Sequence, residues 1–198
     1  MHPWGVTTFK MNFKESPATN RILVEMNALQ AALTCIDDGR PLSDAALASI
    51  KEVQSFPVVD NEMGWVAQVA RAHVLSEEFE PVRFPLVEDG QADTRMFTYL
   101  ARAWSCWAAG DIEAAKVLLK ALDEDEDAHI PGGHLHVMAL DAWSQAIEAL
   151  LDANPKEARR YYRRAIEAGS QFGTWTNNAV QWTYVASFLE HDELNSTL

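Results

Sequence analysis

The 198-residue chain has little of what several classes of protein require. Its two cysteines, Cys35 and Cys106, cannot supply the disulfide framework of a small secreted domain, and they lack the CxxC spacing of a zinc site. No run of about 18 apolar residues is present, so we expect no membrane-spanning helix. The N-terminus also lacks the basic and apolar regions of a signal peptide. These absences predict a soluble, cytoplasmic protein with reduced, buried thiols.

Basic residues are scarce. Sixteen Lys and Arg stand against 29 Asp and Glu, which gives a net charge of −13 and an isoelectric point near 4.8. Such a protein repels phosphate backbones and anionic lipids, so neither nucleic acid nor a membrane surface is an expected partner. A basic peptide or protein suits the charge better. The alternative interpretation is that the acidity only keeps the protein soluble.

Enzyme signatures are also missing. The chain contains no GxSxG, GxxxxGK, GxGxxG or HExxH motif, and Ser105 lies in an apolar helical pattern instead of at a strained turn. We therefore expect neither catalysis nor a cofactor. His129, His134 and His136 lie beside several carboxylates, where a divalent metal site is conceivable. We expect a polar loop instead, since no packed second shell is visible around these histidines.

What the chain does have is a ladder of bulky residues. Trp65, Trp104, Trp143 and Trp182 stand 39 residues apart, with Met26 one further step upstream. Large apolar residues that recur at such a period are typical of stacked helical units, which bury their faces against each other. We expect the four tryptophans to lie in the core.

Apolar spacing and helix-end residues divide the chain into parts. Residues 1–16 form an N-terminal arm, and residues 17–78 form N-terminal helical hairpins. The first helix of this region is predicted to end at Gly39, and the second to begin at Ser43. Residues 79–94 read as an irregular crossover because prolines exclude a regular helix there. Helical pairs follow over 95–198, and the last helix, about 174–190, is predicted to cap the stack. The first helix is expected to bury one face: Ile22, Met26, Leu29, Leu33 and Ile36.

The second helices of two pairs match at a step of 43 residues. The first of these helices follows a Gly-Asp turn and the second an Asn-Pro turn. Each carries a small residue, then a large one, then another small or apolar one at the same spacing. These residues are Ala115, Leu119 and Leu122 in the first helix and Ala158, Tyr162 and Ala165 in the second. This pattern resembles the tetratricopeptide repeat over about 95–190. The resemblance implies an all-α fold, a right-handed α-α superhelix of about nine helices. Because the period is longer than the usual 34 or so residues, a HEAT-like assignment stays open.

The resemblance also implies a function. Tetratricopeptide-like proteins act as adaptors, scaffolds or chaperone-like modules that hold a peptide or protein segment on a concave surface of first helices. Polar side chains there would hydrogen-bond the backbone and basic side chains of that segment. The expected ligand-groove residues are Arg102, Asp141, Gln145, Glu148, Asn177, Asn178 and Gln181.

One helix is strongly basic on one side. Its basic residues are a possible docking patch for an acidic partner or phosphate: Lys156, Arg159, Arg160, Arg163 and Arg164. The other interpretation is a solvated outer face, neutralised by the acidic run at 123–127, and the outer position of second helices favours it. Two other functions remain open. One is an immunity-type inhibitor that masks a basic partner, and the other is a sensory domain that binds a small molecule in an aromatic pocket.

Overall fold

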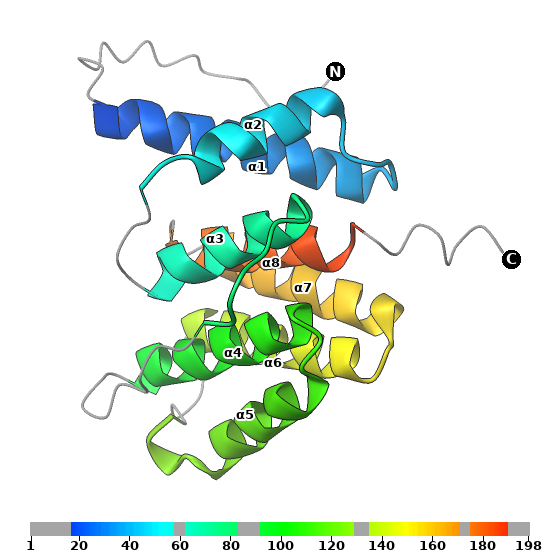
Figure 1. Ribbon diagram of the computed structural model, residues 1–198. Helices are drawn as coiled ribbons and strands as arrows, with labels where there is room; N and C mark the ends of the chain where they lie inside the picture. Colours follow the sequence, from blue (N-terminus) through cyan, green and yellow to red (C-terminus); the bar gives the residue numbers. More distant parts are fainter. Residues whose placement is uncertain (1–16, 58–61, 83–91, 129–134, 171–174, 190–198) are drawn as a thin grey trace, which may run out of the picture.

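The computed structural model describes residues 17–57, 62–82, 92–128, 135–170 and 175–189. Within these ranges the chain is all-α, with eight α-helices and one short 3-10 helix, and contains no strand. The expected all-α class is thus confirmed, with one helix fewer in these ranges than the approximate number predicted. The elements are α1 Pro17–Asp37, α2 Asp44–Gln54, α3 Glu62–Val74, α4 Ala92–Ala108, α5 Ile112–Glu124, η1 Glu126–Ala128, α6 Leu135–Leu151, α7 Pro155–Ser170 and α8 Trp175–Ser187 (Figure 1).

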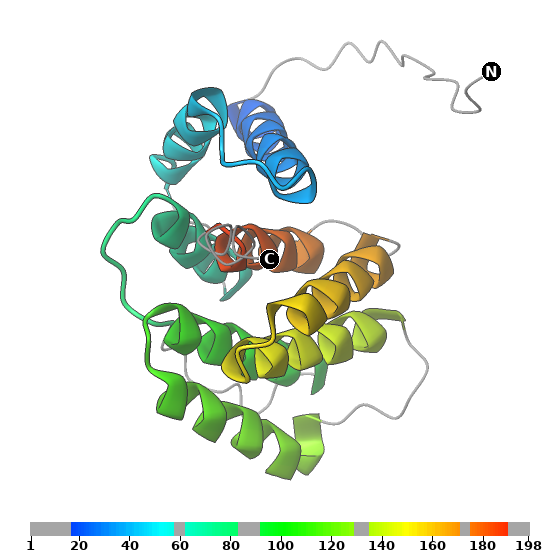
Figure 2. The same cartoon turned by 90° about the vertical axis from the view of Figure 1, so that its right-hand side faces the viewer.

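Helices that are consecutive in the chain form hairpins. The pairs α1 with α2, α4 with α5 and α6 with α7 pack against each other, which confirms the antiparallel pairing expected in the second half. Figure 1 shows α1 and α2 as one layer, α3 and α8 below them, then α4, α6 and α7, with α5 at the far end. The same order is visible from the side in Figure 2.

The position of α8 differs from the prediction. Instead of capping the last hairpin from outside, α8 packs against α3, α7 and α1, so it lies within the stack. Almost every described side chain from Ala179 to Phe188 is buried, with Gln181 partly exposed. A helix whose described side chains are buried on nearly every side lies inside a fold, whereas a terminal cap presents a polar outer face to solvent. The expected C-terminal capping helix is therefore wrong, because α8 also contacts α1 and α3, which are distant from it along the chain.

Four helices end in the same way. In each case a residue with positive φ donates its N–H to the carbonyl three residues back, and the next residue donates to the carbonyl five back, at 2.8 to 3.2 Å. This is the Schellman arrangement, which satisfies carbonyl groups that the helix leaves without partners. The residues with positive φ are Gly39, Ser76, Gly110 and Ala153.

Two of these turns, before α5 and before α7, occupy equivalent positions in the two aligned hairpins. After Gly110, Asp111 caps α5 by accepting from the N–H of Ala114 at 3.1 Å, and after Ala153, Asn154 caps α7 by accepting from the N–H of Glu157 at 3.3 Å. Because the bonding is the same 43 residues apart, the alignment of the two second helices is confirmed at the level of the backbone.

The matched turns give a paired prediction. A residue with a Cβ strains at positive φ, so Ala153→Gly should raise the free energy of unfolding by about 0.5–1 kcal/mol and Gly110→Ala should lower it by a similar amount. Apart from its neighbours in the chain, a Cβ at Gly110 would meet no atom within 4 Å. The expected loss therefore comes from backbone strain and not from a steric clash. Urea unfolding checks both, and a shift of the same sign in the two variants would contradict the argument.

The tryptophan ladder is buried in three of its four positions. Trp104, Trp143 and Trp182 are fully buried, whereas Trp65 is 38% exposed. The prediction that all four lie in the core is therefore wrong for Trp65, which is near the start of α3 and faces outward.

The expected buried face of α1 is also partly wrong. Leu29 and Ile36 are buried and Leu33 is half-buried, but Ile22 and Met26 are exposed. Small residues explain the shift, because α1 packs against α2 and α8 along a side that includes Ala28 and Ala32, and small side chains allow helices to approach closely. Two other expectations concern residues outside the described part of the chain: the whole of the arm at 1–16, and most of the crossover, since 83–91 are not described.

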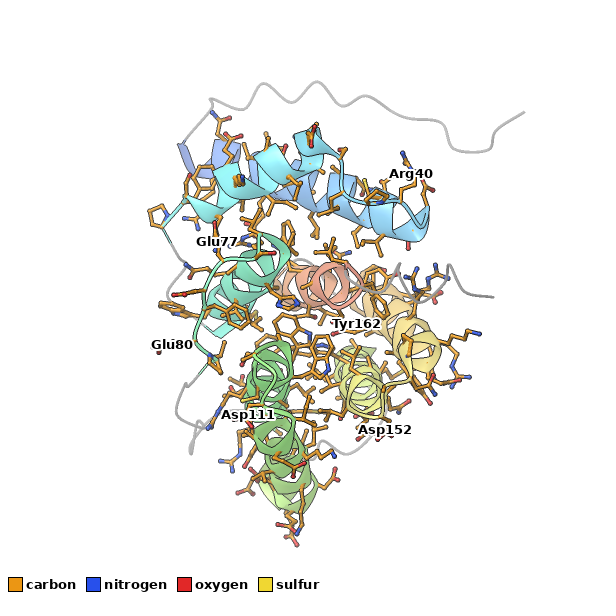
Figure 3. The ribbon with its side chains drawn as sticks, turned by 45° about the vertical axis from the view of Figure 1, so that its right-hand side comes forward. Arg40, Glu77, Glu80, Asp111, Asp152 and Tyr162 are labelled. Carbon is orange, nitrogen blue, oxygen red and sulfur yellow. The ribbon has the colours of Figure 1, made fainter. Side chains whose placement is uncertain are left out.

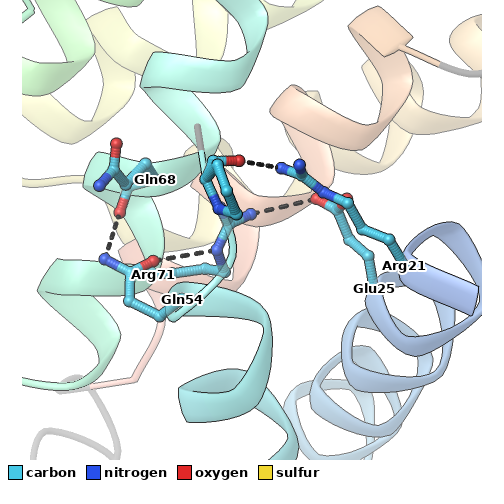
Figure 4. Close-up of polar contacts among 6 residues, drawn as sticks. Arg21, Glu25, Gln54, Gln68 and Arg71 are labelled. Carbon is cyan, nitrogen blue, oxygen red and sulfur yellow. Dashed lines mark hydrogen bonds and ion pairs between the residues drawn. The ribbon is translucent and has the colours of Figure 1, made fainter. Parts of the chain in front are cut away.

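A buried ion pair links α1, α2, α3 and α8. Nη1 of Arg71 lies 3.1 Å from Oε1 of Glu25, and its Nε donates to Oε1 of Gln54 at 3.1 Å (Figure 4). The guanidinium also lies 5.4 Å from the ring centroid of Trp182. Four helices thus meet at a single arginine.

A second polar group lies deep in the bundle. Tyr162 on α7 is fully buried, and Figure 3 shows it inside the stack of helices. Its hydroxyl is 3.3 Å from Oγ of Ser187, which accepts a hydrogen bond from Nε1 of Trp104 at 3.0 Å. This contact joins α4, α7 and α8.

Candidate functional site

The predicted ligand-groove residues lie on three helices. Arg102 is on α4, Asp141, Gln145 and Glu148 are on α6, and Asn178 and Gln181 are on α8. Asn177 also belongs to α8, but its side chain is outside the described part. α8 packs against α3, α7 and α1. Its residues Asn178 and Gln181 therefore do not line the depression at the α6–α7 turn.

Gln145 and Glu148 are the two predicted residues that the structure brings together. They line a depression of about 230 Å³ where α6 turns into α7. The turn contributes Asp152 and Asn154, and the first turns of α7 contribute Glu157 and Tyr161, so that side chains from the turn and from both helices surround the space. We call this set the acidic depression. Figure 3 shows Asp152 at the outer end of the α6–α7 hairpin, on the surface of the molecule.

The local shape follows from the sequence of the turn. The Schellman arrangement at Ala153 reverses the chain after α6, and Asn154 then caps α7. As a result Glu148, one turn before the end of α6, and Glu157, in the first turn of α7, face the same space. A short hairpin turn thus gathers carboxylates from both of its helices.

The surroundings of Glu148 in the acidic depression disfavour its charged form. The pKa of the Glu148 carboxyl is raised above its ordinary value, first by partial removal from water and then by the neighbouring carboxylates of Asp123 and Asp152. Asp123 comes from α5, so a third helix adds to the negative potential. Glu157, by contrast, pairs with Arg160 at 2.6 Å.

The basic docking patch on α7 is partly used within the molecule. Arg159 donates from Nη1 to the carbonyl of Ile36 at 3.3 Å, and Arg163 lies 3.6 Å from the carboxylate of Asp37. Both contacts are at the C-terminus of α1, where a helix carries partial negative charge. Arg159 also lies 4.7 Å from the ring centroid of Phe188. These two arginines therefore attach α7 to α1.

The other basic residues remain at the surface of α7. Arg160 and Arg164 lie 4.8 and 5.9 Å from the ring centroid of Tyr161, and Lys156 is exposed. Two carboxylates of the acidic run at 123–127, the predicted source of neutralisation for this face, form ion pairs with helices other than α7.

The acidic run has its own partners. Asp125 pairs with Arg95 at 2.5 Å, and Glu124 pairs with Lys120 at 3.6 Å. The cations in these two ion pairs come from α4 and α5.

Neither a metal centre nor a membrane span is found in the described part of the chain. Within it, no group of three or more His, Cys, Asp and Glu side chains is arranged to hold a metal ion. The side chains of His129, His134 and His136 lie outside that part. None of the helices searched there is long and apolar enough to cross a bilayer.

Comparison with protein-family models, with curated proteins and with solved structures finds no match to this chain.

Sequence reasoning identified two residues of the acidic depression and missed the others. Asp152 and Asn154 belong to a turn, and Glu157 and Tyr161 to a second helix, whereas the prediction considered first helices alone. A signal was available, because the alignment placed Asn154 opposite Asp111 at the start of its helix. Asp123 could not have been found this way, since its proximity to Glu148 depends on how α5 packs on α6.

Proposed function

We propose that this protein is a protein-interaction module that binds a basic segment of another protein at the acidic depression. The observation that carries the proposal is that Glu148, Asp152 and Glu157 line one depression. The pKa of Glu148 is raised there, first by burial and then by the carboxylates of Asp123 and Asp152. A carboxylate whose pKa is raised by burial and by neighbouring negative charge is stabilised by a cation, and a bound lysine or arginine supplies one. The net charge of −13 acts in the same direction by attracting basic partners from a distance.

The chemistry of binding follows from the lining. Glu148 and Asp152 accept charge-assisted hydrogen bonds from a guanidinium or ammonium group, and the amide of Gln145 is available to the backbone of the bound segment. The depression is small, so it accommodates one side chain and its neighbours instead of a whole helix. Affinity beyond that has to come from the surrounding surface.

The same proposal includes the finer fold assignment. We assign the α4–α5 and α6–α7 hairpins as tetratricopeptide-like units of a superhelical stack, supported by their equivalent turns and caps at 110–111 and 153–154. In this assignment the protein works as an adaptor or scaffold, in which a rigid hairpin presents the acidic depression.

An arginine-rich fluorescent peptide is a direct probe of this proposal. The double variant Glu148→Gln, Asp152→Asn should bind it about tenfold more weakly than the unmodified protein, because two carboxylates that contact the peptide are lost. Affinity should also fall as the pH drops through the raised pKa of Glu148, since protonation removes one of the charges. Fluorescence anisotropy measures both effects.

A matched control separates the site from the net charge. Glu113 and Glu124 on α5 have side chains that are 87% and 69% exposed, so Glu113→Gln, Glu124→Gln removes the same charge elsewhere. This control should retain nearly all of the affinity. Equal weakening in the two double variants would mean that the peptide responds only to overall charge, and the proposed site would be wrong.

A further inference from the structure

The outward face of α1 carries no charge, although charged residues make up 23% of the chain. Its exposed side chains between residues 22 and 34 are all uncharged: Ile22, Leu23, Met26, Asn27, Gln30 and Thr34. The two charged residues of this stretch make contacts within the molecule (Figure 4). Arg21 donates to the carbonyl of Pro57, and Glu25 pairs with the buried Arg71.

The N-terminal half of this face is apolar. Ile22, Leu23 and Met26 are 45%, 52% and 61% exposed, and helical geometry places them within an arc of about 100° over little more than one turn. Single exposed apolar side chains are common, whereas neighbouring ones mark a surface for contact with another segment. We call these three residues the α1 patch.

The segment that precedes α1 has a matching pattern. Because α1 begins at Pro17, the N-terminal arm is attached at the end of the helix that is nearer to the α1 patch. Within the arm, large apolar residues occupy every second position at Phe9, Met11 and Phe13. The residues that follow them are polar: Lys10, Asn12 and Lys14. On an extended backbone this alternation places all the apolar side chains on one side.

We propose that residues 9–13 fold back along α1 as an extended segment whose apolar side covers the α1 patch. The lengths agree. Residues 14–16 join this segment to Pro17, and three residues are enough to reverse the chain. From there the segment reaches about 13 Å at 3.3 Å per residue, and Met26 lies about 14 Å from the start of the helix.

Charge favours the arm over an occupant from outside. With its apolar side on the α1 patch, the segment directs Lys10 and Lys14 away from it, and a protein with a net charge of −13 attracts both. A second copy would bring another −13 to the contact, and a basic partner would find no carboxylate on the patch. The arm is also tethered, so it binds at a high effective concentration.

The cover is reversible. Ordering the segment costs conformational entropy, which offsets much of the gain from burying three large side chains. The contact should therefore slow proteolysis of the arm without abolishing it.

Trypsin cleavage of the full chain after Lys10 and Lys14 tests the cover, because a protease needs the segment to leave the surface. The double variant Leu23→Gln, Met26→Gln removes apolar area from the α1 patch without changing the charge. Cleavage at both lysines should then be about fivefold faster than in the unmodified protein. Mass spectrometry follows the products.

A matched control removes apolar area elsewhere. Val117 on α5 and Met138 on α6 are 66% and 50% exposed, so Val117→Gln, Met138→Gln should leave the cleavage rate unchanged. Equal rates in the unmodified protein and the α1 patch variant would overturn the proposal. With trypsin far from saturation, a rate constant that falls as the protein concentration rises would also overturn it, since a second copy would then cover the patch.

A cross-link tests which side of the segment faces α1. Under mild oxidation, Met11→Cys with Met26→Cys should form an intramolecular disulfide about tenfold faster than Asn12→Cys with Met26→Cys, because successive side chains of an extended segment point to opposite sides. Both pairs retain Cys35 and Cys106, which makes the comparison internal. An arm that is merely tethered near α1 would cross-link both pairs at the same rate, and that result would overturn the proposed contact.

Discussion

Replacing Arg71 with methionine should lower the free energy of unfolding by about 3–5 kcal/mol, because breaking a buried ion pair leaves a charge without a partner. Arg71 is 7% exposed, and the side chain of Glu25 is only 15% exposed. Burial lowers the pKa of Arg71 to about 10, with Glu25 opposing the shift, so the guanidinium remains charged at neutral pH. Loss of this guanidinium strands the Glu25 carboxylate and removes a contact shared by four helices.

A second variant distinguishes a stranded charge from lost packing. Arg71→Met combined with Glu25→Leu removes both charges, and it should be more stable than Arg71→Met alone because no carboxylate is left buried. Urea unfolding measures the difference. If the double variant is the less stable of the two, the loss comes from packing against Trp182 and not from electrostatics.

An exposed pair supplies the control for the same substitution. Arg40 lies 2.5 Å from Asp38, with side chains that are 61% and 53% exposed. Arg40→Met should leave the unfolding midpoint unchanged, since solvent screens such pairs. A comparable loss in both methionine variants would contradict the distinction between buried and surface pairs.

Replacing Tyr162 with alanine should lower the free energy of unfolding by about 3–5 kcal/mol, because a fully buried aromatic ring is removed and a cavity remains. The ring centroid of Tyr162 lies 5.5 Å from that of Tyr184 and 6.0 Å from that of Phe188. These contacts join α7 to α8, so the loss should loosen the helix that lies within the stack. Thermal or urea unfolding measures it.

Tyr162→Phe keeps the ring and isolates the hydroxyl. Burial raises the pKa of Tyr162 from 10.0 to about 12, so between these values the folded protein holds a proton that the unfolded chain has lost. Stability therefore falls as the pH rises above 10, by about 2 kcal/mol at pH 12 for a pKa difference of about two units at 1.36 kcal/mol per unit. The phenylalanine variant should lose less stability over this range, at the cost of about 1 kcal/mol at neutral pH for the missing hydrogen bond to Ser187.

The neighbouring Tyr161 is the control for the alkaline experiment. It lies on the same helix but is only partly buried, so Tyr161→Phe should follow the unmodified protein as the pH rises. If Tyr162→Phe loses stability as steeply as the Tyr161 variant does, the buried hydroxyl is not the group that titrates.

Helix ends were predicted best where a residue type has a specific backbone role. Ser43 caps α2 by accepting from the N–H of Ala46, and Gly39 ends α1, both as expected. The predicted Asn-Pro turn places Pro155 at the first position of α7. The region of N-terminal hairpins was expected to run to residue 78, but its last helix, α3, ends at Val74, because Ser76 adopts a φ of 54°. Glycine is the residue that indicates a positive φ, and serine does not, so the sequence could not predict that α3 ends there.

The candidate site was predicted only in part, for a related reason. Gln145 and Glu148 were found because they share one face of a helix, and helical spacing is visible in sequence. Their neighbours Asp152 and Glu157 come from the turn and the next helix, and Asp123 from an earlier one. Local spacing cannot show which helices approach each other.

The sequence by itself determined that this chain is helical, where most of its helices begin and end, and that two hairpins repeat at a step of 43 residues. These properties depend on local periodicity and on caps within a few residues. Only the tertiary structure decided that α8 lies within the stack, that Arg71 pairs with Glu25 across 46 positions, and that α1 turns Ile22 and Met26 outward. Each of these depends on which apolar faces fit together over long distances along the chain, and many pairings of amphipathic helices satisfy the same local pattern.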